Sequence, residues 1–295
     1  MRRRQSEISP RCLCFYALCF ADVLHISTGC CQEKEYLKLY AYTLIEFPVV
    51  VHLDLDSLIL QPFDDLYDSM IDGDNGKLPI MHNSTAPTNI QAFYTKDYNM
   101  IRPGHPHPGV QGGFIVIKPN LDYFEEYRQT ILEGNYKSGA GWGGKWGGYF
   151  GAQQIQGLCS YFFEALHPGS AVELNRCMYN SMNDNPKGPN RRKEPITMMC
   201  RDGKPTCDDC RTTPIEKVKS IHFTLCQKPW ICPFYVLHDG QCAEFHKKWF
   251  SIRKDWEESN GLDKIDTSTI NFYNDVFQGY CKGEGERQYT KIRLS

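Results

Sequence analysis

Residues 47–56 read FPVVVHLDLD, and this stretch decides the fold class of the chain. The first seven residues are apolar and β-branched almost throughout, which is typical of a strand buried on both faces of a parallel sheet. The run ends at Asp54-Leu55-Asp56, where two carboxylates lie two residues apart and project to the same side. The segment therefore predicts a buried strand that delivers a pair of acidic side chains to one edge of a sheet.

The segments that flank this strand predict an α/β domain. Residues 33–40 have the periodicity of a helix, and residues 113–117 (GFIVI) form a second apolar strand. A helix is expected over 121–132, with Asn120 as its cap and Gly134 as its stop. This alternation is typical of a doubly wound, mostly parallel sheet, in which ligands bind beyond the carboxyl ends of the strands.

Composition and charge exclude several classes of protein. The chain has 295 residues, of which 41% are hydrophobic and 23% are charged, so it can bury a sizeable core. Its 33 Lys and Arg against 35 Asp and Glu give a formal net charge of −2, which argues against a nucleic-acid partner. No stretch reaches the roughly 18 apolar residues that a membrane-spanning helix needs.

The N-terminus and the cysteine content indicate a secretory route. Residues 1–4 (MRRR) are basic, and residues 12–21 (CLCFYALCFA) form a short apolar run of the length found in signal peptides. A mis-assembled start of the gene over residues 1–29 accounts for this segment equally well. Fourteen Cys are too many for an ordinary cytosolic protein and suit an oxidising compartment or a metal site. Membrane association is expected through the N-terminus only.

The cysteines of the C-terminal half leave two interpretations open. One is a zinc site, because Cys200-x6-Cys207-x2-Cys210-x15-Cys226 contains a C-x-x-C pair. The other is disulfides, which are favoured on grounds of compartment although the sequence does not reveal their connectivity. The cysteines considered for pairing are Cys159, Cys177, Cys200, Cys207, Cys210, Cys226, Cys232 and Cys242.

The acidic pair at the end of the first strand predicts a divalent-metal site. Asp54 and Asp56 would repel each other unless a cation lay between them, and carboxylate oxygens suit Mg²⁺ or Mn²⁺. His222 lies at the end of a third predicted strand over 218–224, and a neutral imidazole is a good ligand for Mn²⁺. Lys228 follows as a point charge suited to a phosphate. The alternative is that the aspartates are solvated and the histidine is an ordinary edge residue.

Three blocks of the sequence resemble the signature blocks of family 8 glycosyltransferases, the glycogenin-like group. They are VVVHLDLDSLILQPFDDLYD (49–68), VQGGFIVIKP (110–119) and HFTLCQKPW (222–230). The plant and algal subgroup of glycogenin-like sugar transferases is more similar still, because its members share the Cys30-Cys31 pair before the EYLKLYAYTL helix and a Cys-rich C-terminal half. The resemblance covers residues 30–255, and three blocks in order are far more specific than a single D-x-D motif.

This resemblance implies a nucleotide-diphospho-sugar transferase fold, a mostly parallel twisted sheet with flanking helices. It also implies a retaining hexosyltransferase that depends on Mn²⁺ (or Mg²⁺) and moves a hexosyl or uronosyl group from a UDP-sugar to a carbohydrate, glycolipid or protein acceptor. Carried over by position, Asp54 and Asp56 would bind the metal and the UDP diphosphate and ribose. His222 would be the third metal ligand, and Lys228 would contact the diphosphate.

The resemblance also implies where the donor sugar lies. Gln111, with Gly112 and Gly113 beside it, occupies the place where the family contacts that sugar. Gln156-Gly157 falls on the family's Asp-Gln-Gly block, near sugar and acceptor. Gln111 and Gln156 are therefore the expected catalytic side chains.

One departure from the family pattern affects the expected mechanism. The Asp of the Asp-Gln-Gly block is Ile155 here, and the related acidic position is Ala152, so no matching carboxylate nucleophile is present. An amide such as that of Gln156 cannot act as a general base. We therefore expect a front-face mechanism, in which the departing phosphate oxygen helps to deprotonate the acceptor.

A second departure concerns the domain organisation. Only 53 residues precede Asp54, so the strand–helix units that grip uracil and ribose in the family are expected to be missing. We expect a signal-like or mis-assembled segment over 1–29, a partial catalytic domain over 30–255 and a polar tail or peripheral helix over 256–295. The expected location is the secretory pathway, in the Golgi or the membrane-associated lumen. The alternatives are a non-catalytic, Cys-rich sugar- or partner-binding module and a zinc-stabilised interaction domain.

Overall fold

The computed structural model describes residues 32–72, 89–187, 199–232 and 240–261. The chain divides into two compact units. Unit 1 consists of the described residues within Met1–Leu53, Asp64–Leu174 and Pro189–Pro205, and unit 2 of those within Asp54–Phe63, Asn175–Gly188 and Thr206–Ser295. The predicted segment over 1–29, and the predicted tail from residue 262 onward, lie outside the described residues.

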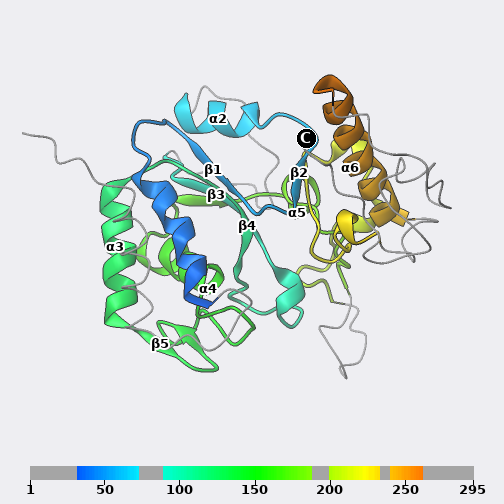
Figure 1. Cartoon of the computed structure of the whole chain (residues 1–295). Helices are drawn as coiled ribbons and strands as arrows, with labels where there is room; N and C mark the ends of the chain where they lie inside the picture. The colour runs from blue at the N-terminus through cyan, green and yellow to red at the C-terminus, as the bar shows by residue number, and fades with distance from the viewer. Residues whose placement is uncertain (1–31, 73–88, 188–198, 233–239, 262–295) are drawn as a thin grey trace, which may run out of the picture. The chain divides into compact units, whose positions relative to one another are not determined.

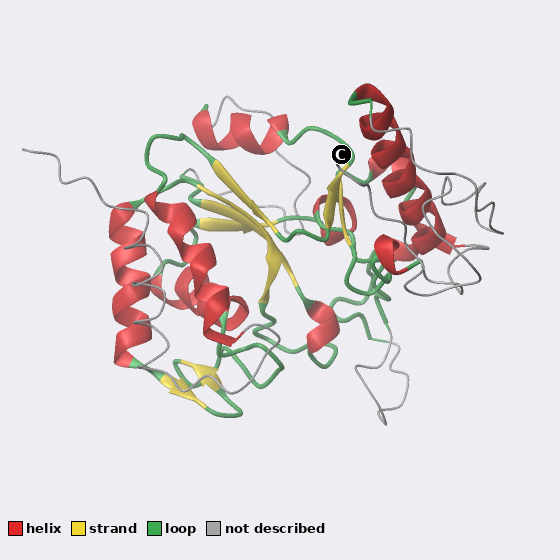
Figure 2. Ribbon diagram, in the orientation of Figure 1, coloured by secondary structure: helices red, strands yellow, loops and turns green. Residues whose placement is uncertain are grey.

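Unit 1 is built on a four-stranded mixed sheet, drawn in yellow in Figure 2. Its strands, in spatial order, are β1 (Val50–Leu53), β4 (Val110–Ile117), β3 (Ala92–Lys96) and β7 (Ala171–Glu173). β4 runs antiparallel to β1 and to β3, whereas β3 and β7 are parallel. The class is α/β as expected, but the expectation of a mostly parallel sheet is wrong for the described strands, since two of the three pairings are antiparallel.

The first predicted strand occupies a different place in the sheet from the one expected. β1 pairs only with β4 among the described strands, and all four of its residues are half-buried rather than buried. β4, the second predicted strand, is instead central and buried throughout. An apolar, β-branched run therefore predicted a strand correctly in both cases. The burial of each strand depends instead on its place in the sheet, because β4 has a paired strand on both sides and β1, among the described strands, on one.

Helix α3 begins and ends where its capping residues predict. In α3 (Leu121–Glu133), the Asn120 side chain accepts hydrogen bonds from the amides of Asp122 and Tyr123, at 2.9 and 3.2 Å. Gly134 ends α3 with a φ of 62°, in the left-handed region that glycine adopts without strain. Figure 1 shows α3 side by side with η1 (Gln32–Thr43), the 3₁₀ helix that forms where a helix was predicted.

The remaining elements of unit 1 complete a core between the helices and the sheet. They are α2 (Asp64–Ile71), η3 (Tyr98–Met100), β5 (Tyr136–Lys137), β6 (Gly141–Trp142), α4 (Ile155–Tyr161) and the π-helical turn η4 (Phe162–Leu166). The core is aromatic: Tyr127 and Phe162 stack with ring centroids 3.8 Å apart, and Trp142 is fully buried with them. β5 and β6 form a short antiparallel hairpin, and β6 lies within the glycine-rich segment 139–150.

Unit 2 is built around a short antiparallel ribbon and one long helix. β2 (Ser57–Ile59) pairs with β8 (Ser220–His222), which is the central part of the strand predicted over 218–224. Ile221 and Phe223 are buried against Phe245 of α6 (Gly240–Ser259). The other elements are α5 (Arg176–Tyr179), η5 (Cys210–Thr212), η6 (Ile215–Lys217) and η7 (Pro229–Ile231).

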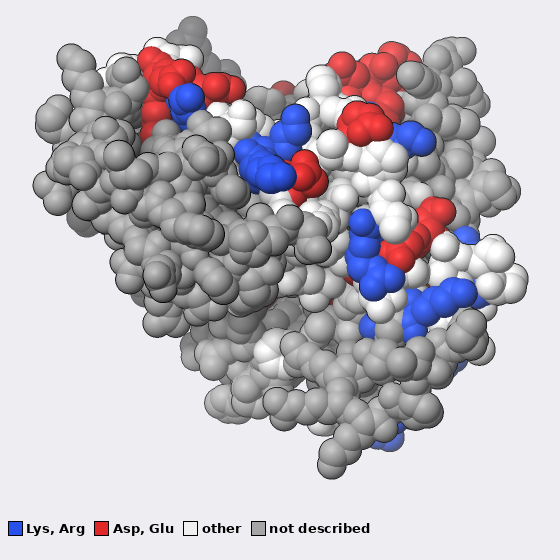
Figure 3. Space-filling view, turned by 90° about the vertical axis from the view of Figure 1, so that its right-hand side faces the viewer, with Lys and Arg blue, Asp and Glu red and all other residues white. Residues whose placement is uncertain are grey.

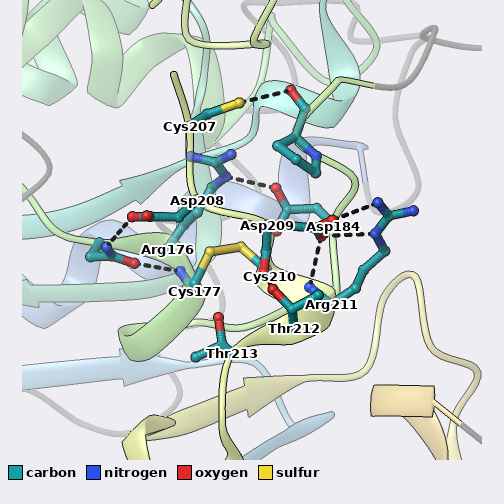
Figure 4. The surroundings of a disulfide bond; sticks show 12 residues. Arg176, Cys177, Asp184, Cys207, Asp208, Asp209, Cys210, Arg211, Thr212 and Thr213 are labelled. Carbon is teal, nitrogen blue, oxygen red and sulfur yellow. Dashed lines mark hydrogen bonds and ion pairs between the residues drawn. A yellow bond between two sulfur atoms is a disulfide. The ribbon is translucent and has the colours of Figure 1, made fainter.

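Disulfides cross-link unit 2. Cys177 is bonded to Cys210, and Cys226 to Cys242. Figure 4 shows the first of these beside the buried Arg176–Asp184 ion pair, whose nearest atoms are 2.6 Å apart. The zinc alternative is therefore wrong, because the four cysteines that would form the site are all disulfide-bonded.

The other cysteines complete this assignment. Cys200, Cys207 and Cys232 are also disulfide-bonded, whereas Cys159, which was considered for pairing, is a free and buried thiol. Pairing fails at Cys159 because it lies within the aromatic core of unit 1. The disulfides fit the oxidising, secretory environment predicted from the cysteine content.

Two surface features agree with the composition. On the face shown in Figure 3, the coloured Lys and Arg side chains are interspersed with Asp and Glu rather than gathered into one basic field, as a net charge of −2 suggests. Among the helices that the structure describes, none is both long and apolar enough to cross a bilayer.

Candidate metal and donor site

A tight turn and a strand pairing in unit 2 bring three candidate ligands together. Asp54 begins a turn that closes when the amide of Ser57 donates to the Asp54 carbonyl oxygen at 3.0 Å. Ser57 then pairs directly with His222 in the β2–β8 ribbon, and the amide of Phe223 donates to the carbonyl oxygen of Asp56 at 2.9 Å. This backbone register sets both carboxylates next to the imidazole. The predicted convergence of Asp54, Asp56 and His222 is therefore present.

The distances within this cluster suit a small divalent cation. The Nε2 atom of His222 lies 3.3 Å from Oδ1 of Asp56 and 3.9 Å from Oδ2 of Asp54, and all three donor atoms lie within 4.8 Å of one another. Six ligands at about 2.1 Å from an ion would lie roughly 3 Å apart when adjacent and roughly 4 Å apart when opposite. The cluster therefore needs only small side-chain rotations to hold such an ion.

Burial divides the cluster into a fixed and an open part. The His222 side chain is 4% exposed, whereas those of Asp54 and Asp56 are 33% and 19% exposed. Leu55, between the two aspartates, is fully exposed. The imidazole is thus held by the core, and the carboxylates face solvent, where an ion and its further ligands can reach them.

Lys228 supplies the cationic partner of this cluster. Its Nζ donates to a carboxylate oxygen of Asp56 and to the carbonyl oxygen of Phe223. An ammonium group placed here neutralises one of the two carboxylates. Lys228 therefore lies where the sequence placed it, beside the acidic pair, and in this structure it is bound to one of the expected metal ligands.

The loop that carries Lys228 is fixed to α6 by two contacts. Cys226 is bonded to Cys242, and the ring Nε2–H of His246 donates to the carbonyl oxygen of Gln227 at 2.8 Å. Burial lowers the pKa of His246 to about 4, so the ring is neutral near pH 7. These contacts were not predicted, because no signal in the sequence pairs residues 226–227 with a distant helix.

The expected sugar-contacting residues lie together in unit 1. Gln111, on β4, is buried, and its Oε1 accepts a hydrogen bond from the amide of Gly113 at 2.7 Å. The carbonyl oxygen of Gly112 accepts from Nζ of Lys38 at 3.0 Å. A Cβ at Gly112 would lie 2.9 Å from the side chain of Ile155, so only glycine fits where β4 meets α4.

Gln156 and Gly157 lie on α4, next to this part of β4. A Cβ at Gly112 would lie 3.6 Å from Cγ of Gln156, so the two glutamine-bearing segments are neighbours within unit 1. Gly157 packs on the backbone of Ala152, where a Cβ would lie 2.8 Å from the carbonyl carbon. The metal-type cluster belongs to unit 2 and the glutamine pair to unit 1.

Unit 1 also contains a charged network that the sequence did not predict. Lys96 contacts Glu164 at 2.8 Å and Glu173 at 3.8 Å, and the indole N–H of Trp146 donates to Glu164 at 3.0 Å. His107 lies 3.6 Å from Glu164 and packs against the Trp146 ring. These residues are scattered along the chain and resemble ordinary surface charges in the sequence.

Comparison with known proteins adds no identification. No protein-family model matches the chain, and no curated protein matches it. An assignment of function therefore depends on the chemistry of the clusters described above.

Proposed function

We propose that this chain is a retaining, metal-dependent glycosyltransferase, which transfers a hexosyl or uronosyl group from a UDP-sugar to a carbohydrate, glycolipid or protein acceptor. The likeness of three sequence blocks to glycogenin-like transferases suggests the family. The proposal includes the nucleotide-diphospho-sugar transferase fold, with a mixed rather than a mostly parallel sheet over the described strands. It also includes a place in the Golgi or the membrane-associated lumen. The disulfides support the secretory part of that placement.

One observation carries the proposal: the donor atoms of Asp54, Asp56 and His222 all lie within 4.8 Å of one another, close enough to bind one divalent ion together. Two carboxylates and an imidazole suit Mn²⁺, and two carboxylates with water suit Mg²⁺. When bound, such an ion would neutralise the charge that develops on a departing diphosphate. Asp54 and Asp56 would hold it from the solvent side, and His222 from the buried side.

Lys228 would provide the second positive charge for the leaving group. A Lys ammonium binds phosphate as a point charge and donates up to three hydrogen bonds. In this structure that ammonium is bound to Asp56. We infer that Lys228 would leave Asp56 when that carboxylate holds a cation, and that its ammonium would then contact the diphosphate of the donor.

Retention of configuration is proposed to proceed on one face of the sugar. The bond between the anomeric carbon and the phosphate oxygen breaks, and the acceptor oxygen forms the new bond on the same side. The acceptor's proton passes to the departing phosphate oxygen, because Ile155 and Ala152 offer no carboxylate base. Gln111 and Gln156 would orient the sugar by hydrogen bonds, with Gly112, Gly113 and Gly157 allowing close approach.

The proposal is tested by Mn²⁺ binding and donor hydrolysis together. Titration calorimetry of the purified, oxidised chain should show one Mn²⁺ site, and incubation with UDP-sugars should release UDP. Asp56→Asn should abolish both, because it removes a charged ligand without changing the side-chain volume. Asp68→Asn is the matched control, since Asp68 is exposed on α2, and it should leave both unchanged.

Two results would contradict the proposal in different ways. If Mn²⁺ does not bind to the wild type, or binds equally to Asp56→Asn, the cluster is not a metal site. If Mn²⁺ binds but no UDP-sugar is hydrolysed or transferred, a non-catalytic, Cys-rich sugar- or partner-binding module becomes the better assignment. One observation favours this second candidate: Asp56, an expected metal ligand, already has a cationic partner in Lys228 and does not need a metal ion to balance its charge.

A further inference from the structure

Unit 1 contains a cleft that is separate from the residues assigned above to metal and donor. Its volume is about 670 Å³, within the range of small-molecule sites. One wall is formed by residues 100–105 and the other by the glycine-rich segment 139–150. Both walls belong to unit 1, so the cleft is defined within a single unit.

The charged side chains of this cleft are all basic. Arg102 comes from the first wall and Lys145 from the second, and both are exposed. Among the described residues that line the cleft there is no Asp or Glu. In a chain whose formal net charge is −2, a cleft lined by two cations and no acid favours an anionic ligand.

His105 adds a neutral hydrogen-bond donor to the first wall. Its Nδ1 accepts a hydrogen bond from the amide of His107 at 3.1 Å, which leaves the ring proton of the neutral form on Nε2. Burial, together with the neighbouring His107, lowers the pKa of His105, so this neutral form predominates near pH 7. A neutral ring with its N–H on Nε2 suits a hydroxyl or an oxyanion.

Besides Lys145, the second wall presents backbone and one aromatic ring. Gly144 and Gly148 have φ values of 73° and 82°, a backbone conformation that is strained for residues with side chains. At these two positions the wall therefore exposes backbone rather than side chains. Phe150 also lines the cleft and is half exposed. An exposed ring beside bare backbone is suited to the apolar face of a pyranose, because such a face can stack on the ring at little conformational cost.

Both walls are held in place without a ligand. In the first wall, the amide of Gly104 donates to the carbonyl oxygen of Arg201 at 3.0 Å, and buried Arg201 donates to the carbonyl oxygen of Tyr98 at 3.3 Å. In the second, Trp146 is fixed by its hydrogen bond to Glu164. The cleft is therefore preorganised, and binding would not have to order its walls.

We propose that this cleft binds a small acidic sugar, a pyranose that carries a carboxylate or a phosphate. Arg102 and Lys145 contact the anionic group from opposite walls, His105 donates to an oxygen of the ligand, and Phe150 stacks on the ring. The inference does not rest on the proposed transferase activity. It requires neither a divalent ion nor a nucleotide.

The test is a set of titrations of the full, oxidised chain without divalent cation or nucleotide. Glucuronate, glucose 6-phosphate, inorganic phosphate and neutral glucose serve as probes, followed by calorimetry or ligand-observed NMR. At least one acidic sugar should bind about tenfold more tightly than glucose, and Arg102→Gln and Lys145→Gln should each weaken it about tenfold. Lys137→Gln is the matched control: it removes an exposed charge from β5, which precedes the second wall and does not line the cleft, and should change the affinity less than twofold.

The choice of probes separates the parts of the proposal. Binding of glucuronate alone identifies a carboxylate site, and binding of glucose 6-phosphate alone identifies a phosphate site. Phe150→Ala should weaken the acidic sugars but not inorganic phosphate, and equal affinity for the sugar in this variant would overturn the stacking role.

The proposal as a whole is overturned by any of three results. They are a dissociation constant above about 10 mM for both acidic sugars, equal binding of glucose, and unchanged affinity in both charge variants. Because the assay contains neither Mn²⁺ nor UDP, these results would leave the proposed transferase activity untouched. Conversely, a failure to bind Mn²⁺ would not affect the cleft.

Discussion

Lys228 donates a hydrogen bond to the carboxylate of Asp56, although 172 residues separate the two in the chain. The same ammonium also donates to the carbonyl oxygen of Phe223, which follows His222. A protein group thus holds one of the three candidate metal ligands. Any cation that uses Asp56 must compete with this ion pair.

Removal of that competing charge should tighten metal binding. We expect Lys228→Met to raise Mn²⁺ affinity about tenfold, because one positive charge a few ångströms from the ion is lost. The same variant should lower UDP release from a UDP-sugar, since the diphosphate loses its cation. Calorimetry and a UDP-release assay measure the two effects. Lys247→Met, an exposed lysine on α6, should change neither, and weaker Mn²⁺ binding in Lys228→Met would show that the lysine supports the ion rather than competing with it.

The Cys226–Cys242 disulfide should stabilise unit 2 and the cluster that it carries. Its loop spans 16 residues, and closure of such a loop contributes about 3 kcal/mol to the free energy of unfolding. Replacement of both cysteines by serine should lower the free energy of unfolding by about 3 kcal/mol and should weaken Mn²⁺ binding. Urea unfolding and calorimetry would measure the two losses.

The second disulfide provides the comparison. Cys177→Ser with Cys210→Ser opens a loop of 33 residues and should destabilise unit 2 by a similar amount. It does not touch the loop between His222 and Lys228, so under conditions where the variant is folded its Mn²⁺ affinity should match that of the wild type. Equal loss of affinity in the two double variants would contradict a local role for Cys226–Cys242.

His246 should make unit 2 sensitive to mild acid. Its pKa is lowered to about 4 in the folded state, against an ordinary value near 6.5, so the unfolded state binds the extra proton between these values. The free energy of unfolding should therefore be fully retained above about pH 6.5 and fall as the pH drops toward 4, by up to about 3 kcal/mol. Urea unfolding at a series of pH values measures this slope.

His246→Gln is the informative variant, because an amide can still donate to the Gln227 carbonyl oxygen but does not titrate in this range. It should remove most of the slope between pH 6.5 and 4. A slope as steep as that of the wild type would assign the acid sensitivity to other groups.

Glu164 should be important for the stability of unit 1. Its carboxylate contacts Lys96 and accepts from Trp146, and its side chain is only 18% exposed. Glu164→Ala should lower the free energy of unfolding by about 3 kcal/mol, since it leaves a partly buried cation with a weaker partner. Glu133→Ala, at the exposed end of α3, should cost less than about 0.5 kcal/mol in the same urea titration. A similar small effect at both positions would show that the network is not stabilising.

The sequence predicted those elements whose signals are local. Asn120 and Gly134 determine the ends of α3 through hydrogen bonds within a few residues, and the structure confirms both. The strands predicted over 47–53 and 113–117 are present as β1 (Val50–Leu53) and β4 (Val110–Ile117), with N-terminal ends that differ by three residues. Their directions were not predicted correctly, because a run of valines favours a strand but carries no information about which neighbour it pairs with or in which sense.

The metal-type cluster was predicted from a likeness of motifs, and its geometry depends on a non-local pairing. Ser57 faces His222 only because β2 and β8 form a ribbon, and no residue in either strand indicates that partner. The cleft in unit 1 could not have been predicted at all. Arg102, His105 and Lys145 are ordinary polar residues in the sequence, and only the folded backbone places them around one space.

The oxidised link between the loop of Lys228 and α6 has a practical consequence for anyone who prepares this protein. A bacterial cytoplasm keeps thiols reduced, so protein made there would lack the Cys226–Cys242 disulfide. The loop beside Asp56 and His222 would then be less firmly fixed to α6. Such a preparation could remain soluble and still be inert. Its lack of activity would then result from the missing disulfide rather than from the sequence. Expression through an oxidising export route is therefore the condition under which activity should be assayed.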